Sequence, residues 1–403
     1  MATIDFRTRS AADVDIRQVD LVSFWQQTLP AAIAEHGNLA AEACASYGLV
    51  PLGLVVGDDA FTLVPAAGSI TVQAGLAEAV VVADIAAEGF SDLVQDMRSM
   101  LSFMTKGDIE IRAGRLSQFI AWEPALRALL DGRAAHRPGT ATFSDRSGEP
   151  LDLDRSFRLT DDRADLAHFL AEAGFALLRG WLDPEDMARI DDDITRALPS
   201  YRPGDGNSWW ATLADGSQRC VRLQRFEDHS PTSHRMLKSP EWRSIASIFA
   251  DGHLAPTGIE ALVKPIGVVE GISDVPWHRD CDLGGHSYDC AAMTCGISVT
   301  PSDEESGALL VVAGSHRAPS PPFVIEPLGL PVVTLRTQPG DITVHLSCTL
   351  HMATPPRRGE RRVMYTDFAL PSRAENPGRA AKISDIRESA PVTVSQPPGY
   401  LGG

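Results

Sequence analysis

Residues 340–370 read GDITVHLSCTLHMATPPRRGERRVMYTDFAL and combine strand patterns with two histidines and a group of arginines. In DITVHL and RRVMYTDFAL, β-branched and aromatic residues dominate, and the segment between them is rich in Pro, Gly and Arg, which is typical of short strands joined by turns. Further runs of this kind begin near residue 258. Closely spaced strands over residues 258–370 favour a sandwich or barrel rather than a parallel sheet.

The length and net charge of the chain restrict the kinds of protein it can be. Its 403 residues exceed what one hydrophobic core usually serves, so we expect two domains. The net charge of −17 disfavours a nucleic-acid partner, because phosphate backbones require a dense basic surface. No run approaches the roughly 20 apolar residues of a membrane span, which predicts no integral membrane association. The start MATIDFRTRS lacks the apolar core of a signal peptide, so we expect a cytoplasmic protein. The oligomeric state stays open.

The amino-terminal half mixes helix and strand patterns. Residues 21–47 predict two short helices interrupted at Pro30 and Gly37, and residues 51–86 predict short strands. A helix is then expected from an N-cap at Ser91 to a stop at Gly107. This order predicts an α+β domain over residues 1–132.

A change in composition separates the two halves. Residues 133–157 are rich in Arg, Gly, Pro, Ser and Asp without apolar periodicity, and we place the linker there. The second domain is expected over residues 158–373, followed by a loosely packed tail at 374–403. Its first helix is expected to be capped by Thr160 or Asp161, and the helix after FALLRG is expected to begin at Asp183 and Pro184.

Two potential metal ligands lie in VPWHRDC, residues 275–281. If this segment is an extended strand, His278 and Asp280 project from one face while Arg279 projects from the other. Non-haem Fe(II) oxygenases bind their metal with two histidines and one carboxylate, leaving positions open for a cosubstrate and O2. His345 and His351 are both candidates for the third ligand. We favour His351, which lies where the apolar run ends and a strand would leave the sheet.

A cosubstrate such as 2-oxoglutarate also requires a cation for its distal carboxylate, and arginine binds carboxylates with two parallel hydrogen bonds. Arg361 and Arg362 open the last strand pattern. Because neighbouring side chains on a strand face opposite sides, only one of the two can point inward. Spacing alone leaves that choice open.

The motifs WHRD, GALLVVAGSH, GDITVHLSCTLHMATPP and RRVMYTDFAL, in this order, resemble the phytanoyl-CoA dioxygenase family of Fe(II)- and 2-oxoglutarate-dependent oxygenases. The opening FLAEAGFALLRGWLDPEDMARIDDDI is also similar to that family. The resemblance covers residues 159–370 and implies a double-stranded β-helix, a cupin-like jelly roll with flanking helices. It implies iron ligation by His278, Asp280 and His351, and 2-oxoglutarate binding by Arg361. A small polar residue that often follows the last histidine by two is Ala353 here. Because Asp280 is retained, halogenation is disfavoured.

The segments ITVQAG, AVVVADIAAEGFSDLVQDM and SFMTKGDIEIRAGRLSQFIAWEPALRALL resemble the sterol carrier protein 2 (SCP2) family. This resemblance covers residues 21–132 and carries no catalytic motif. It implies an α+β domain that binds lipids or acyl chains in an apolar tunnel.

Other polar and aromatic residues have plainer interpretations. The six cysteines lack C-x-x-C spacing and are expected to be reduced thiols. A zinc site from Cys281, Cys290, Cys295 and His286 is disfavoured by their irregular spacing. His286 and His316 are expected in turns, Trp209 and Trp210 in packing, and Met97, Met100 and Met104 in the first core. Lys264 is a weaker candidate for a second anion contact.

These observations predict a non-haem dioxygenase that uses Fe(II), 2-oxoglutarate and O2 and releases succinate and CO2. The expected reaction is hydroxylation of a C–H bond in a hydrophobic small molecule, such as a lipid, an acyl thioester or a natural-product intermediate. Desaturation or ring closure would use the same site. The alternatives are a lipid carrier with a catalytically silent oxygenase-like domain, and a metal-dependent isomerase or lyase that forms no succinate.

Overall fold

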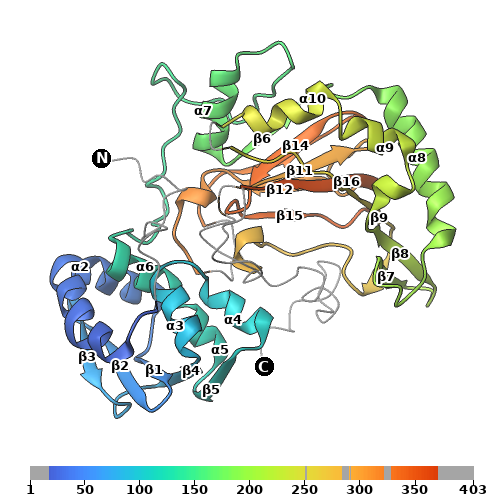
Figure 1. The fold of residues 1–403 in the computed structure, drawn as a ribbon. Coiled ribbons are helices and arrows are strands. Elements are labelled where there is room, and N and C mark those ends of the chain that lie inside the picture. The colour runs from blue at the N-terminus through green and yellow to red at the C-terminus, as the bar shows by residue number, and fades with distance from the viewer. Residues whose placement is uncertain (1–17, 250–251, 284–289, 291, 322–327, 371–403) are drawn as a thin grey trace.

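The computed structural model describes residues 18–249, 252–283, 290, 292–321 and 328–370 (Figure 1). The described chain has two large hydrophobic cores. The first draws its buried side chains from residues 21–129 and the second from residues 157–368. The predicted tail at 374–403 lies outside the described residues. The exact domain boundaries on either side of residues 133–157 stay predictions.

The amino-terminal domain packs helices against a five-stranded sheet with strand order β3-β2-β1-β4-β5 (Figure 1). Strands β1 and β4 are parallel, and the other neighbours are antiparallel. The strands are β1 (Leu52–Val56), β2 (Asp59–Ala66), β3 (Ser69–Ala74), β4 (Val81–Ile85) and β5 (Ile109–Ala113). The helices are α1 (Leu21–Ser23), the π-helix η2 (Phe24–Thr28), α2 (Leu29–Tyr47), α3 (Ala87–Val94), α4 (Met100–Lys106), α5 (Leu116–Ile120) and α6 (Glu123–Asp131). This is the predicted α+β order; the SCP2 resemblance stays a prediction.

Helix α2 corrects the predicted break at Gly37. Pro30 lies where the π-helix η2 passes directly into α2, and α2 continues through Gly37 to Tyr47. A Cβ at position 37 would come within 2.8 Å of Oγ of Ser69 on β3. Gly37 therefore serves the close approach of helix and sheet rather than a break, which helical periodicity alone does not reveal.

The single helix predicted from Ser91 to Gly107 is two helices. Ser91 is buried inside α3, and the chain turns at Asp96, whose φ is 58°. Ser99 then caps α4 by accepting a hydrogen bond from the Ser102 amide. Gly107 ends α4 in the left-handed conformation, as predicted. Met100 is buried in the first core and Met104 packs against it, as predicted, whereas Met97 is buried but is not among the members of that core.

The carboxy-terminal domain contains an eight-stranded sheet with order β10-β7-β8-β9-β16-β11-β14-β6 and a three-stranded sheet with order β13-β12-β15. Both sheets are antiparallel, and with their flanking helices they fit a jelly-roll-like domain (Figure 1). The strands are β6 (Phe175–Leu178), β7 (Ser208–Leu213), β8 (Gln218–Leu223), β9 (Glu260–Lys264), β10 (Val268–Glu270), β11 (Met293–Ser298), β12 (Leu309–Val312), β13 (Val332–Leu335), β14 (Ile342–Leu346), β15 (His351–Ala353) and β16 (Arg361–Phe368).

The flanking helices begin at polar caps. Asp162, rather than Thr160 or Asp161, caps α7 (Arg163–Ala173) by accepting a hydrogen bond from the Ala164 amide. Asp183 caps α8 (Pro184–Ala197), with Pro184 in its first turn as predicted. The other helices are α9 (Pro231–Met236), α10 (Pro240–Arg243) and the 3₁₀ turns η3 (Leu198–Ser200), η4 (Phe226–Asp228), η5 (Ser244–Ser247), η6 (Asp280–Leu283) and η7 (Ser315–Arg317).

His316, in η7, predicts an acid-dependent loss of stability. Its Nε2 lies 2.8 Å from the carbonyl oxygen of Ala171, and burial lowers its pKa from 6.5 to about 4. Above pH 6.5 both folded and unfolded chains hold it neutral. As the pH falls from 6.5 to 4, only the unfolded chain gains the proton, so the free energy of unfolding should decrease by about 3 kcal/mol.

This change is measured by urea unfolding of the wild type and of His316→Gln at pH 7 and pH 4. The variant should lose about 3 kcal/mol less than the wild type over this interval. Equal losses in the two proteins would show that His316 does not carry the effect.

Candidate metal centre

His278 and His351 lie next to each other across a short antiparallel bridge. The amide of His278 donates to the carbonyl of His351 at 3.1 Å, and the amide of His351 donates back at 3.0 Å. Directly paired residues place their side chains on one face, and the two imidazole rings are 4.2 Å apart between centroids. Residues 73 positions apart in sequence are thus brought together by the sheet that contains β15.

Asp280 completes this group from a different local structure than predicted. The predicted strand is absent: His278 forms only an isolated bridge, and Asp280 opens the 3₁₀ turn η6. Its Oδ1 nevertheless lies 3.5 Å from Nε2 of His278 and 3.8 Å from Nε2 of His351. The three potential ligand atoms lie within 4.8 Å of one another. Arg279 points away, as expected, and donates to the Cys348 carbonyl and to Oγ of Ser320.

Backbone carbonyls orient the two imidazoles. Nδ1 of His278 lies 2.7 Å from the Pro276 carbonyl, and Nδ1 of His351 lies 2.8 Å from the Thr349 carbonyl. A carbonyl can only accept, so each Nδ1 carries the proton and each Nε2 keeps a free lone pair facing Asp280. Oγ1 of Thr294 also donates to Oδ2 of Asp280 at 2.9 Å. This arrangement leaves two imidazole nitrogens and one carboxylate oxygen directed at one point.

The protonation states also suit metal binding. Burial and the neighbouring imidazoles of His345 and His278 hold the pKa of His351 well below its usual value. Burial would raise the pKa of Asp280, but the surrounding imidazoles outweigh it and hold that pKa well below its usual range. Metals bind neutral imidazole and ionised carboxylate. Two imidazoles and one carboxylate match the donor set of non-haem Fe(II).

His345 lies beside this group, on β14. Its Nε2 is 3.4 Å from Oδ2 of Asp280, and its ring is 4.0 Å from that of His351. Unlike the other two imidazoles, its Nδ1 has no hydrogen-bond partner among the described residues. The geometry therefore favours His351 as the third ligand, with His345 as the competing candidate.

The two candidate arginines face opposite sides of β16. Arg361 is buried and lines the cavity over the metal centre, and its NH1 donates to the Gly307 carbonyl at 2.7 Å. Its Nε has no partner within the described chain. Arg362 instead pairs with Asp191 at 3.0 Å on the flank of α8. Arg361 is thus the cation available to an anion in the cavity.

Lys264 lies opposite Arg361 on β9 but already has a counter-ion. Its Nζ is 3.0 Å from Oδ1 of Asp274, and both side chains are almost fully buried. Burial and the nearby Arg361 lower the pKa of Lys264 to about 8, while Asp274 opposes that shift. Because Asp274 already balances its charge, Lys264 is a weaker anion site than Arg361, which has an unused Nε donor.

A cavity of about 620 Å³ contains the candidate ligands and Arg361. Its walls include the apolar side chains of Val221, Ile259, Leu262, Ile272 and Val275. They also include an ion pair between Arg222 on β8 and Glu260 on β9, and Trp209, over whose ring the Arg222 guanidinium lies at 4.2 Å. The sequence predicted only a packing role for Trp209 and gave no sign of the Arg222–Glu260 pair. Only the pairing of β7, β8 and β9 puts these residues beside the metal centre.

Three further residues were singled out from the sequence, and the structure describes two of them. Ala353, two residues after His351, lines the cavity and supplies no hydroxyl to it. His316 lies in a turn, as predicted, but is buried against α7. His286 lies outside the described residues.

Jelly-roll-like sheets with a candidate metal centre in a cavity are the features of a metal-dependent enzyme domain. In agreement, residues 170–364 match the phytanoyl-CoA dioxygenase (PhyH) family. The chain therefore carries a PhyH family domain. No curated protein matches the chain.

Several solved structures resemble part of the chain. AviO1 from Streptomyces viridochromogenes Tue57 is 25% identical, with a TM-score of 0.44 over 54% of this chain and 96% of that one. The epimerase SnoN, solved with Fe3+, alpha ketoglutarate and nogalamycin RO, is 22% identical, with a TM-score of 0.41 over 57% and 95%. EvdO2 from Micromonospora carbonacea var. aurantiaca is 20% identical, with a TM-score of 0.39 over 56% and 98%. At these TM-scores the family assignment rests on the family match.

Within the described residues, every helix is too short or too polar to cross a lipid bilayer.

Proposed function

We propose that this protein is a non-haem Fe(II)- and 2-oxoglutarate-dependent dioxygenase. The observation that carries the proposal is the convergence of His278, Asp280 and His351, with ligand atoms within 4.8 Å of one another, at a cavity that also contains Arg361. Three protein ligands leave the remaining positions of an octahedral ion to small molecules. This favours an enzyme over the alternative of a silent carrier.

The expected reaction converts R–H, O2 and 2-oxoglutarate into R–OH, succinate and CO2. Iron and 2-oxoglutarate, when bound, supply the activation of O2. The protein's own contribution is to orient the ligating imidazoles through the carbonyls of Pro276 and Thr349 and to bind the distal carboxylate of 2-oxoglutarate at Arg361. Walls of apolar side chains keep water from the reacting carbon, which protects the oxidising step.

For the substrate we propose a small molecule with an apolar body and a polar group. The volume of about 620 Å³ suits such a ligand. Val221, Leu262 and Val275 would contact the apolar part, and Arg222 and Glu260 offer charged partners for a polar group. A lipid, an acyl thioester or a natural-product intermediate fits this description, and hydroxylation is its simplest outcome.

The proposal is tested by adding Fe(II) and 2-oxoglutarate to the apoprotein without oxygen. We expect a visible metal-to-ligand absorption band, and succinate on exposure to O2. In His278→Ala both signals should be lost. Absence of iron binding in the wild type would support the carrier, and turnover of a substrate without succinate would support an isomerase or lyase.

A further inference from the structure

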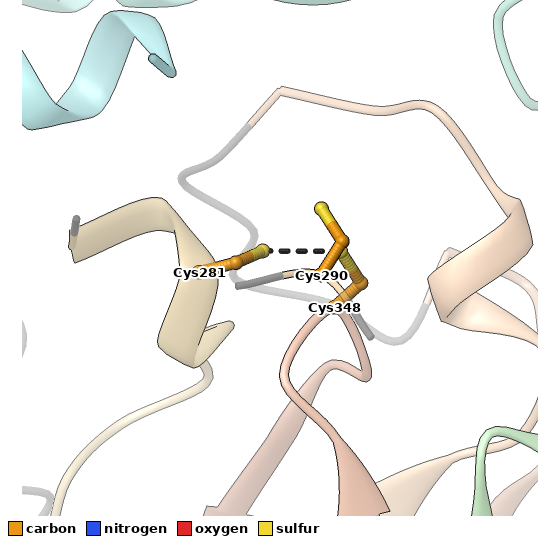
Figure 2. A group of neighbouring side chains, drawn as sticks. All are labelled: Cys281, Cys290 and Cys348. Atoms are coloured by element: carbon orange, nitrogen blue, oxygen red, sulfur yellow. Dashed lines mark hydrogen bonds between the residues drawn. The ribbon is translucent and has the colours of Figure 1, made fainter. Parts of the chain in front are cut away.

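Three of the six cysteines, Cys281, Cys290 and Cys348, lie close together (Figure 2). Cys281 lies in η6, Cys290 in the turn before β11, and Cys348 in the turn between β14 and β15. Their sulfur atoms lie within 4.8 Å of one another, and Sγ of Cys281 and Sγ of Cys348 are 3.1 Å apart. All three side chains are buried. Segments up to 67 residues apart in sequence therefore deliver three thiols to one place.

This cluster differs from the other cysteines of the chain. Cys44 packs in the first hydrophobic core, and Cys220 and Cys295 pack in the second. Cys281, Cys290 and Cys348 instead form a separate buried cluster, and within the described chain these three cysteines are its only buried members. The zinc set considered from the sequence contained Cys295, but the fold replaces it with Cys348. Sequence spacing could not reveal a ligand 58 residues after Cys290.

We propose that Cys281, Cys290 and Cys348 bind a thiophilic metal ion, Zn²⁺, separate from the His278–Asp280–His351 centre. Thiolates bind Zn²⁺ at about 2.3 Å, so three of them around a tetrahedral ion lie about 3.8 Å apart. One separation in the cluster is 3.1 Å and none exceeds 4.8 Å, so small rotations of the side chains would bring the sulfur atoms to this value. The fourth position is left to another donor, such as water.

The surroundings favour a metal over a disulfide. A disulfide would use two of the thiols and leave the third buried without a role, whereas a metal uses all three. Zn²⁺ with three thiolates carries one net negative charge. The buried guanidinium of Arg279 donates to the Cys348 carbonyl at 3.2 Å and is a cation close to Cys348, while the Asp96 carboxylate is close enough to Cys290 to act on its thiol. Helix α4 of the amino-terminal domain packs against η6, the turn that contains Cys281.

The position of the cluster gives the ion a structural role. Cys281 directly follows Asp280, and Cys348 lies midway between His345 and His351. A metal bound here would tie together the turns that hold the candidate iron ligands, and so pre-organise them. Zinc binding itself does not depend on the oxygenase reaction and is measurable without it.

The first test is metal binding by the full chain. After reconstitution of His278→Ala with Zn²⁺ and removal of excess, we expect about one tightly held equivalent per chain, whereas the wild type can hold a second at the His278–Asp280–His351 centre. Co²⁺ added to the zinc-depleted protein should produce ultraviolet thiolate-to-cobalt charge-transfer bands. His278→Ala should retain these bands, because it changes only the other centre. Absence of the cobalt bands in the wild type would overturn the proposal without any variant.

The second test compares cysteine variants. Cys348→Ser should lower Zn²⁺ affinity by at least about 100-fold and remove the cobalt bands. Cys295→Ser, which changes a buried cysteine outside the cluster, should leave both unchanged. Equal zinc binding in the two variants would refute the assignment. So would a Cys281–Cys348 disulfide found by peptide mass spectrometry in protein purified with zinc and without added oxidant.

Discussion

His351→Gln is expected to lower Fe(II) affinity by more than about 100-fold, whereas His345→Gln should change it by less than about 10-fold. The reason is orientation: the Thr349 carbonyl fixes the proton of His351 on Nδ1 and leaves Nε2 to the metal. His345 has no such partner on its Nδ1 in the described chain. Both imidazoles are buried, so the substitutions are closely matched.

Anaerobic equilibrium titration with Fe(II) measures both affinities, and circular dichroism checks that each variant folds. The succinate yield should follow the same order. If His345→Gln abolished iron binding and His351→Gln did not, the third ligand would be His345. If neither variant changed it, the metal would lie elsewhere and the oxygenase assignment would fail.

Arg361→Gln should raise the KM for 2-oxoglutarate roughly 10- to 100-fold, which corresponds to about 1.5–3 kcal/mol for a lost charge-assisted interaction. The guanidinium faces the cavity with an unused Nε donor, and glutamine supplies neither its charge nor its planar fork. Fe(II) binding should be unchanged, because the ligands are not touched.

Arg362→Gln is the matched control. It removes the same charge from the neighbouring residue, but its partners are Asp191 and Glu360 on the outer side of the sheet. We expect a KM within about 2-fold of the wild type, because neither Arg362 nor its two partners lines the cavity. A larger effect from Arg362→Gln than from Arg361→Gln would reverse the assignment of the cosubstrate cation.

Local sequence patterns predicted much of the fold because they report local forces. Alternating β-branched residues mark strands such as β14 and β16, and Asp183 followed by Pro184 marks the start of α8. Predictions failed where distant contacts intervene. Gly37 lies inside α2, where a Cβ would come too close to Ser69, so this glycine marks a helix–sheet contact and not a helix end. Asp280 opens a 3₁₀ turn, although its spacing from His278 suits a strand.

By itself, the sequence determined the residue types of the candidate metal centre, the strand-rich half that contains them and the expected reaction class. The tertiary structure alone decided which arginine faces the cavity, which imidazole is oriented for a metal, and that Cys348 rather than Cys295 joins Cys281 and Cys290. The physical reason is that side-chain periodicity is a property of one segment. Whether side chains from different segments come together depends on how separate strands and turns are paired. Arg361 and Arg362 are neighbours on β16, yet the first faces the cavity and the second pairs with Asp191, so a shift of one residue in the register would exchange them.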